Sequence, residues 1–180
     1  IIKNQLLKLY DSKHYIFPHI HPHWLDSIFL KDIKEFDLSN LSRYSLASLP
    51  QNDIENLFKK SMDLLSEMGI AYQTYGYRAG GWCIQPFCLY EKIFEKYNIL
   101  HEFSALPGYK NDSEQQKFDF SELKIREPYF FSKNVELEDK KGVFIQYPIS
   151  TLFFNSYAKF KDRLVRKYLW KTGDRSWGNG

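Results

Sequence analysis

Residues 70–82 read Ile-Ala-Tyr-Gln-Thr-Tyr-Gly-Tyr-Arg-Ala-Gly-Gly-Trp, and this stretch decides the fold class of the chain. Residues 70–78 are rich in aromatic and β-branched side chains, which favours a strand, and the Gly80-Gly81 pair that follows breaks it. Predicted helices lie before and after this strand. We therefore expect strands and helices in alternation, which is typical of α/β folds with a largely parallel sheet.

The helix before this strand, residues 52–68, is the clearest in the sequence. Asn52 and Glu55 have the spacing of a capping box, and Gly69 supplies a left-handed C-terminal stop. Its apolar side chains recur at i, i+3 and i+4, which predicts one buried stripe. The expected stripe consists of Ile54, Leu57, Phe58, Ser61, Leu64, Leu65 and Met68.

The rest of the chain continues the alternation. Pro86 fits the first turn of a second helix, residues 86–97. Further strands are expected at residues 14–20, 99–104 and 142–147. A helix end at 1–10, a structured loop at 24–50, a long charged and irregular connection at 110–141 and a basic helix at 155–171 complete the expected order. In parallel sheets, reactive side chains gather at the C-terminal ends of the strands, so we look for chemistry there.

The composition excludes several classes of protein. The chain has 180 residues, of which 43% are hydrophobic, and this fits one domain over residues 1–180 with a sizeable core. A net charge of +3 gives no nucleic-acid footprint, and no apolar run approaches the ~20 residues of a membrane-spanning helix. The two cysteines, Cys83 and Cys88, cannot form a disulfide scaffold.

Three histidines, His19, His21 and His23, lie at the end of the predicted strand 14–20. Imidazole is a common metal ligand, and zinc sites combine His nitrogens with a carboxylate. Residues i and i+2 of a strand point the same way, so His19 and His21 are placed to share a metal. Because Pro22 breaks the strand, convergence of His19 with His23 is an alternative. The simpler interpretation is a polar strand end whose imidazoles bond to the backbone.

A second group of candidate residues follows the strand at 70–78. Arg78 is permanently charged and suits bidentate contact with a carboxylate. The two glycines permit a tight turn with close backbone approach, and aromatic rings offer flat apolar faces to a sugar. The candidates for substrate binding are Trp24, Tyr77, Gly80, Gly81 and Trp82. The alternative is a plain turn between strand and helix with an Arg on the surface.

The segments His19-x-x-x-His23 and Arg78-Ala79-Gly80-Gly81 together resemble, in order and spacing, the motifs of the polysaccharide deacetylase family. This family is also called the chitooligosaccharide deacetylase homology domain. The most similar variant is a bacterial branch associated with surface-polysaccharide biosynthesis. Residues 100–108 and 142–150 resemble later strand ends of the same family, so the resemblance spans residues 15–150.

The resemblance implies a deformed (β/α)7 TIM-like barrel and metal-dependent removal of an acetyl group from an N-acetylated sugar or glycan. The implied metal ligands are His19 and His23, with an Asp, and the implied metal is divalent, most often zinc. His21 has no ligand role in the family pattern and is a further candidate on geometry alone. A second Asp would act as general base, and Arg78 is the implied catalytic residue that holds this Asp charged and in position.

The sequence departs from the family pattern at both ends. The family begins with an Asp-containing strand and ends with a strand that carries a general-acid His, and neither has a match here. We therefore expect either that the given chain is incomplete, lacking its N-terminal strand or strands, or that it is a catalytically inactive carbohydrate-binding or scaffold domain. A third interpretation, the amidohydrolase type, needs His ligands on later strands, where only His101 is available.

The expected location is cytoplasmic, and the first residues show no signal-peptide pattern. Contact with a membrane surface through the basic helix at 155–171 is an alternative. The expected partner is an N-acetylated sugar or glycan, and the sequence leaves the oligomeric state open.

Overall fold

The structure is a computed structural model that describes residues 2–151, 157, 160–165 and 167. The chain divides into two compact units, Ile1–Ser150 and Thr151–Gly180. The helix predicted at 155–171 lies partly outside the described residues. The described residues within it are helical, whereas its basic residues Lys159, Arg166 and Lys171 lie outside them.

The first unit is built on a five-stranded sheet with the order β1-β4-β5-β9-β8. Its strands are β1 (His19–Ile20), β4 (Tyr75–Ala79), β5 (Ile99–Glu102), β9 (Phe144–Gln146) and β8 (Tyr129–Phe131). The first four are parallel, and β8 runs antiparallel to β9. The predicted mixed α/β fold with a largely parallel sheet is therefore confirmed. The parallel strands lie side by side in chain order, as neighbouring strands do in a barrel wall. Within the described residues, however, the sheet does not close.

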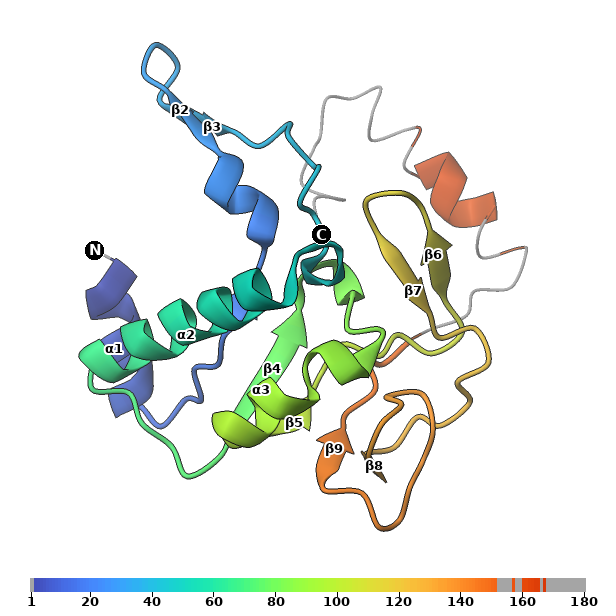
Figure 1. Cartoon of the computed structure of the whole chain (residues 1–180). Coiled ribbons are helices and arrows are strands. Elements are labelled where there is room, and N and C mark those ends of the chain that lie inside the picture. Colours follow the sequence, from blue (N-terminus) through green and yellow to red (C-terminus); the bar gives the residue numbers. More distant parts are fainter. Residues whose placement is uncertain (1, 152–156, 158–159, 166, 168–180) are drawn as a thin grey trace. The chain divides into compact units, whose positions relative to one another are not determined.

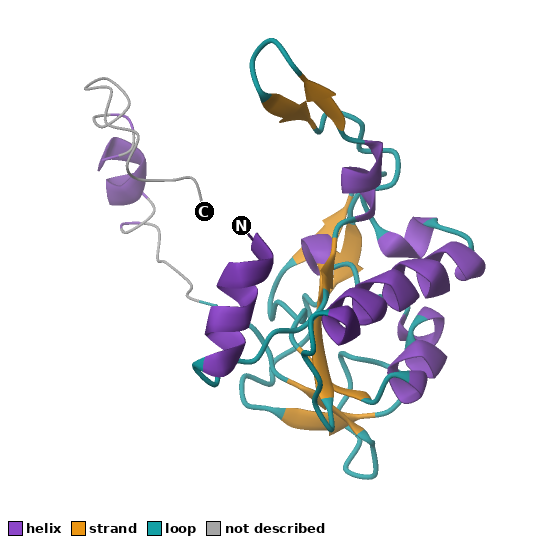
Figure 2. Ribbon diagram, turned by 90° about the vertical axis from the view of Figure 1, so that its left-hand side faces the viewer, coloured by secondary structure: helices purple, strands orange, loops and turns teal. Residues whose placement is uncertain are grey.

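Helices α2 (Gln51–Glu67) and α3 (Glu91–Lys96) lie on the same side of the sheet (Figures 1 and 2). Ring contacts join the layers, because Tyr77 of β4 lies 4.8 Å from Phe58 of α2 and 5.7 Å from Phe94 of α3 between ring centroids. All three rings are buried, and they form the centre of the core. The helix α1 (Ile2–Asp11) confirms the helix expected at 1–10.

Helix α2 forms at the predicted place, but its beginning differs from the prediction. Pro50 is the N-cap, and its carbonyl accepts the N–H groups of Asp53 and Ile54 at 2.9 and 3.2 Å. Asn52 therefore lies inside the helix, and the predicted capping box is wrong. The left-handed stop at Gly69 is confirmed by a φ of 76°. The buried stripe is Ile54, Phe58, Met62 and Leu65.

All four predicted strands are shorter than expected: those predicted at 99–104 and 142–147 form β5 at 99–102 and β9 at 144–146, and the other two begin late. Residues 14–18 precede β1 without a ladder, and residues 70–74 form the approach to β4. Pro18 has no N–H to donate to a strand ladder. The ring of Phe17 before it packs against Phe103, at 6.3 Å between centroids. Gly76 permits this contact, because a Cβ there would lie 2.6 Å from Phe103 and 2.7 Å from Phe17.

Other predicted elements are divided or more ordered than expected. The helix expected at 86–97 is a 3-10 turn, η4 (Phe87–Leu89), followed by α3, and Tyr90 between them donates its hydroxyl to the carbonyl of Cys83 at 3.1 Å. The loop at 24–50 contains a hairpin of β2 (Ile28–Leu30) and β3 (Glu35–Asp37), with 3-10 turns η1 (Pro22–Asp26) and η2 (Leu46–Ser48) on either side. The connection at 110–141 contains β6 (Lys110–Asp112), β7 (Lys117–Asp119) and β8.

In the part of the chain that the structure describes, no helix combines the length and apolar character needed to cross a membrane.

Candidate functional site

The sheet brings the two sequence motifs together at one end. In the parallel pair of β1 and β4, His19 lies opposite Arg78 and Ile20 opposite Ala79. The chain leaves both strands at the same end of the sheet, so His21, which begins the η1 turn, and the Gly80-Gly81 turn become neighbours. This juxtaposition is the one that the strand-end argument predicts.

The nitrogens of His19 and His21 converge. His19 Nδ1 lies 2.7 Å from the carbonyl oxygen of Arg78, and since this nitrogen can only donate to a carbonyl, Nε2 of a neutral His19 carries the lone pair. That Nε2 lies 2.9 Å from Nε2 of His21. In the neutral pair His21 is therefore the donor, and its Nδ1, which is buried without a hydrogen-bond partner, is left as an unused acceptor.

His23 lies on the other side of His21. Its ring is buried, stacks on Tyr44 at 4.8 Å with an interplanar angle of 19°, and lies 5.4 Å from the ring of His21. Burial lowers the pKa of His23, and the nearby charge of Asp26 partly opposes this. The family-derived ligand pair His19 and His23 is thus separated by His21, and the pair with facing nitrogens is His19 and His21. Among the described residues, no three His, Cys, Asp or Glu side chains are grouped to hold a metal ion.

His21 is the most strongly shifted histidine of the site. Burial, together with the charges that His19 and His23 can carry, lowers the pKa of His21 to about 4. Its imidazole is therefore neutral at pH 7. A neutral imidazole keeps one lone pair, with which it can bind a metal ion or accept a hydrogen bond.

Aromatic rings and glycines surround these histidines. Trp24 stacks on His21 at 4.6 Å and 14° and is 53% exposed, so one face of the indole is open to solvent. A Cβ on Gly80 would lie 2.5 Å from the carbonyl oxygen of Ile20 and 3.0 Å from His21 Nδ1. Gly81 has a φ of 59°, and a Cβ there would lie 2.5 Å from Tyr44. The glycine pair therefore allows the turn to pack directly against the histidines and Tyr44.

Arg78 is exposed, and its guanidinium has no hydrogen bond or ion pair within the described residues. The acidic side chain nearest in sequence to the histidines, Asp26, is instead paired with Arg43, whose Nε donates to Oδ2 at 2.8 Å. This pairing lowers the pKa of Asp26 and raises that of Arg43. The expected carboxylate partner of Arg78 therefore has no counterpart among these residues.

The two aromatic candidates of the strand-end motif lie apart from Trp24. Adjacent residues of β4 point to opposite faces of the sheet, and Tyr77 points to the face that α2 and α3 cover. Its ring is fully buried there and is closed to solvent. Trp82 is half-buried and contacts Phe118 edge-on at 5.8 Å. Of the predicted substrate-binding rings, Trp24 is the one that presents an exposed face beside the histidines.

Several residues of the site escape sequence reasoning. Tyr44 comes from a loop without periodicity, and only packing on Gly81 and His23 reveals it. Gln116 of the β6–β7 hairpin donates to the carbonyl of Gly81 at 2.8 Å. Ser104 Oγ accepts the N–H of Ala79 at 2.7 Å and ties the end of β4 to the segment after β5. The one available sequence signal was Glu102, a carboxylate within a predicted strand, and its side chain accepts the N–H of Ser104.

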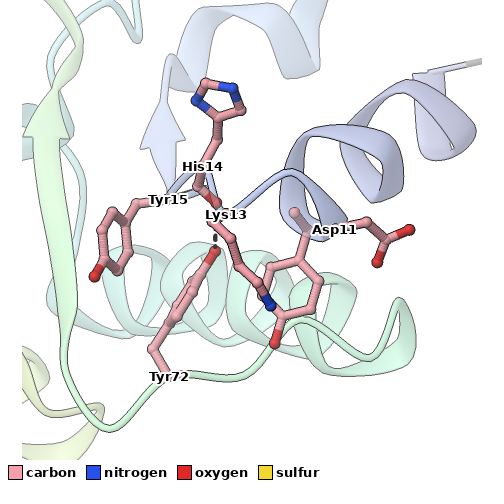
Figure 3. A pocket seen from close by; sticks show the side chains of 6 residues that line it. Asp11, Lys13, His14, Tyr15 and Tyr72 are labelled. Carbon is pink, nitrogen blue, oxygen red and sulfur yellow. Dashed lines mark hydrogen bonds between the residues drawn. The ribbon is translucent and has the colours of Figure 1, made fainter.

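Two surface hollows lie away from the histidine cluster. The first, of about 290 Å³, is lined by Tyr10, Asp11, Lys13, His14, Tyr15 and Tyr72 (Figure 3). The second, of about 300 Å³, is lined by Tyr15, Phe17, Thr74, His101, Phe103 and Tyr147. Neither includes His19, His21 or His23. The candidate site is therefore described by its converging side chains at the C-terminal ends of β1 and β4.

No protein-family model matches the sequence, and no curated protein or solved structure matches it either. The geometry of the described residues and the short motifs are therefore what supports a function.

Proposed function

We propose that the chain is a polysaccharide deacetylase-like domain that binds a divalent metal, most suitably zinc, through His19 and His21, and that it serves the removal of N-acetyl groups from a sugar or glycan. The observation that carries the proposal is the convergence of two Nε2 atoms at 2.9 Å, with His19 oriented by the Arg78 carbonyl. A ligand histidine typically donates its second ring nitrogen to such a carbonyl.

The spacing of the two nitrogens fits a shared metal after a small movement. Two ligands at zinc–nitrogen distances of 2.0–2.1 Å and a tetrahedral angle lie about 3.3 Å apart. The side chains need to separate by a few tenths of an ångström from 2.9 Å. His21, whose pKa is lowered to about 4, is neutral at pH 7, so it loses no net proton on binding, but the proton on its Nε2 must first move to Nδ1. His23 would support the pair from its buried place beside Tyr44, as a neighbour of His21 rather than a direct partner of His19.

A metal bound here would polarise an acetyl carbonyl and lower the pKa of a bound water. Trp24 offers an open aromatic face beside the histidines, against which a sugar ring can rest. Arg78 lies opposite His19 in the register of β1 and β4, and its exposed guanidinium is free to hold a carboxylate. The described residues supply two imidazoles, so further ligands would be water or a carboxylate from elsewhere.

Zinc titration of the full chain by calorimetry tests the metal site. We expect one zinc per chain, and we expect His19→Ala and His21→Ala each to abolish binding. His14→Ala is the matched control, because His14 is exposed and lines the hollow of Figure 3. Equal binding by the wild type and His19→Ala, with retained fold by circular dichroism, would contradict the proposal. A loss with His23→Ala but not with His21→Ala would favour the family-derived pair.

The second candidate is a catalytically inactive domain that binds glycans. The unpaired guanidinium of Arg78 favours it, as does the engagement of Asp26 by Arg43. Acetate release from N-acetylglucosamine oligomers, measured with zinc present, separates the two functions. Turnover supports the deacetylase, whereas binding without turnover supports the inactive domain. A cytoplasmic location remains part of the proposal.

A further inference from the structure

The hairpin of β2 and β3 carries a dense set of exposed apolar side chains. It projects away from the sheet and helices of the first unit (Figures 1 and 2). Ile28 is 63% exposed, Ile33 59% and Phe36 62%, and Phe29 and Leu30 are exposed as well. Isolated apolar side chains on a surface are ordinary, but a contiguous cluster of this kind marks an interaction surface.

Both faces of this hairpin carry exposed apolar side chains. The register places Phe29 opposite Phe36 on one face, where their rings lie 5.1 Å apart. The other face carries Ile28 opposite Asp37 and Leu30 opposite Glu35. A two-stranded hairpin without further strands is marginally stable in water. A partner that packs flat against the hairpin would cover only one of its faces. Additional strands that pair at its edges would instead extend it into a larger sheet.

The two edges of the hairpin differ in charge. Strand β3 contains Glu35 and Asp37, and charged side chains on an edge strand oppose pairing with another chain. Strand β2 reads Ile-Phe-Leu and has no such charge. The free edge of β2 is thus the edge that is open to a further strand.

We propose that β2 pairs with β2 of a second copy of this chain, antiparallel and centred on Phe29. In this register, Ile28 of each copy lies opposite Leu30 of the other, so all cross-strand pairs are apolar. The result is a four-stranded sheet across two copies, with both β3 strands outside and their carboxylates in water. Pairing through β3 centred on Phe36 would instead place Glu35 opposite Asp37, which like charges disfavour. The contact is self-complementary, as a twofold interface requires.

The charges of the hairpin disfavour a lipid surface as the occupant. Residues 28–37 include Lys31, Asp32, Lys34, Glu35 and Asp37 among the apolar side chains. Each such charge opposes insertion into hydrocarbon, so the apolar faces cannot enter a bilayer without them.

Light scattering after gel filtration, over a series of concentrations of the full chain, tests the association. We expect concentration-dependent dimers, and we expect Phe29→Lys to weaken association about a hundredfold because it places two lysines opposite each other. Leu64→Lys is the control, since Leu64 is 58% exposed on α2 and lies outside the hairpin. A wild type that stays monomeric at every concentration overturns the proposal, as does an equal loss of association in both variants. Sedimentation of monomers with phosphatidylcholine–phosphatidylglycerol vesicles also overturns it.

Crosslinking tests the register. In a Cys88→Ser background, which removes the exposed cysteine, Phe29→Cys is expected to form a disulfide-linked dimer under mild oxidation. Phe36→Cys lies on the outer strand and is expected to crosslink far more slowly. Equal rates for the two variants overturn the centred pairing. None of these measurements involves a metal or a sugar, so they are independent of the proposed function.

Discussion

A single carboxylate in the core, Glu102, gives the protein a predictable response to pH. It is fully buried, and both of its side-chain oxygens accept the N–H of Ser104, at 3.0 and 2.9 Å. Burial raises the pKa of Glu102 to about 7, and the hydrogen bonds from Ser104 and Gln146 only partly oppose this. The folded protein therefore binds this proton more tightly than the unfolded chain does.

We predict that Glu102 causes the free energy of unfolding to fall as the pH rises. Its folded pKa, about 7, exceeds its usual 4.5, so its contribution is fully present below pH 4.5 and is lost as the pH rises to 7. The loss amounts to roughly 3 kcal/mol, at about 1.4 kcal/mol per pKa unit. Urea unfolding at pH 5 and pH 8 should show that Glu102→Gln removes this decline. Glu67→Gln, at an exposed position on α2, should retain it, and a decline of equal size in both variants would refute the assignment.

Gly80 and Gly69 provide a matched pair of substitutions. We predict that Gly80→Ala destabilises the fold by about 1–3 kcal/mol and weakens zinc binding, because the new Cβ meets the Ile20 carbonyl at 2.5 Å and His21 Nδ1 at 3.0 Å. Gly69→Ala meets nothing within 4 Å and has only the cost of a φ of 76°, about 1 kcal/mol. Thermal melts and zinc titrations of both variants check this. Zinc affinity that falls equally in both would show that the effect is global.

At the scale of single residues, sequence reasoning reached one part of the site. The meeting of His19 with Arg78 follows from where two parallel strands end, and the structure confirms it. Which two histidines face each other depends on the η1 turn, and the contribution of Tyr44 depends on loop packing. Neither leaves a periodic signal in the sequence.

Helix α2 illustrates what periodicity predicts and what it leaves open. The i, i+3, i+4 pattern correctly placed the helix and three of its buried residues, Ile54, Phe58 and Leu65. It included Leu64, which is exposed, and missed Met62, which is buried, because both lie near the boundary of the stripe. The cap was wrong because the carbonyl of Pro50, rather than a polar side chain, begins the hydrogen bonding.

We predict that two substitutions on α2 differ sharply in their cost. Phe58→Ala should lower the free energy of unfolding by about 3–5 kcal/mol, because Phe58 is fully buried against Tyr77, Tyr90 and Phe94. Leu64→Ala should change it by about 0.5 kcal/mol or less. Chemical denaturation of both variants gives the two values. Similar costs would mean that the helix is rotated from the position described.

The short strands of the hairpins were beyond sequence reasoning for a physical reason. Alternating burial is the signal of a strand, and β2 is exposed at all three positions. The β6–β7 hairpin likewise has one buried residue within its strands, Phe118 of β7, which joins the core together with Phe120 just after the strand.

At the scale of the whole molecule, the core belongs to the first unit. The buried core side chains of the described residues lie between Ile20 and Phe144, and β9 is the last strand of the sheet along the chain. We predict that a chain ending at Ser150 keeps one cooperative unfolding transition within about 3 °C of the full chain, a shift that corresponds to about 1 kcal/mol. Calorimetry of both chains checks this. A truncated chain that melts without cooperativity would show that residues 151–180 belong to the same folding unit.

The order of strands in the sheet has a consequence for synthesis on the ribosome. Because β1, β4 and β5 pair in the order in which they are made, each new strand finds its partner already exposed on the nascent chain. Once residue 104 has left the exit tunnel, β1, α2, β4, α3 and β5 are all available to assemble. The last parallel strand, β9, then adds at the open edge of β5, and β8, which is made before β9 but pairs only with it, joins the sheet once β9 is available.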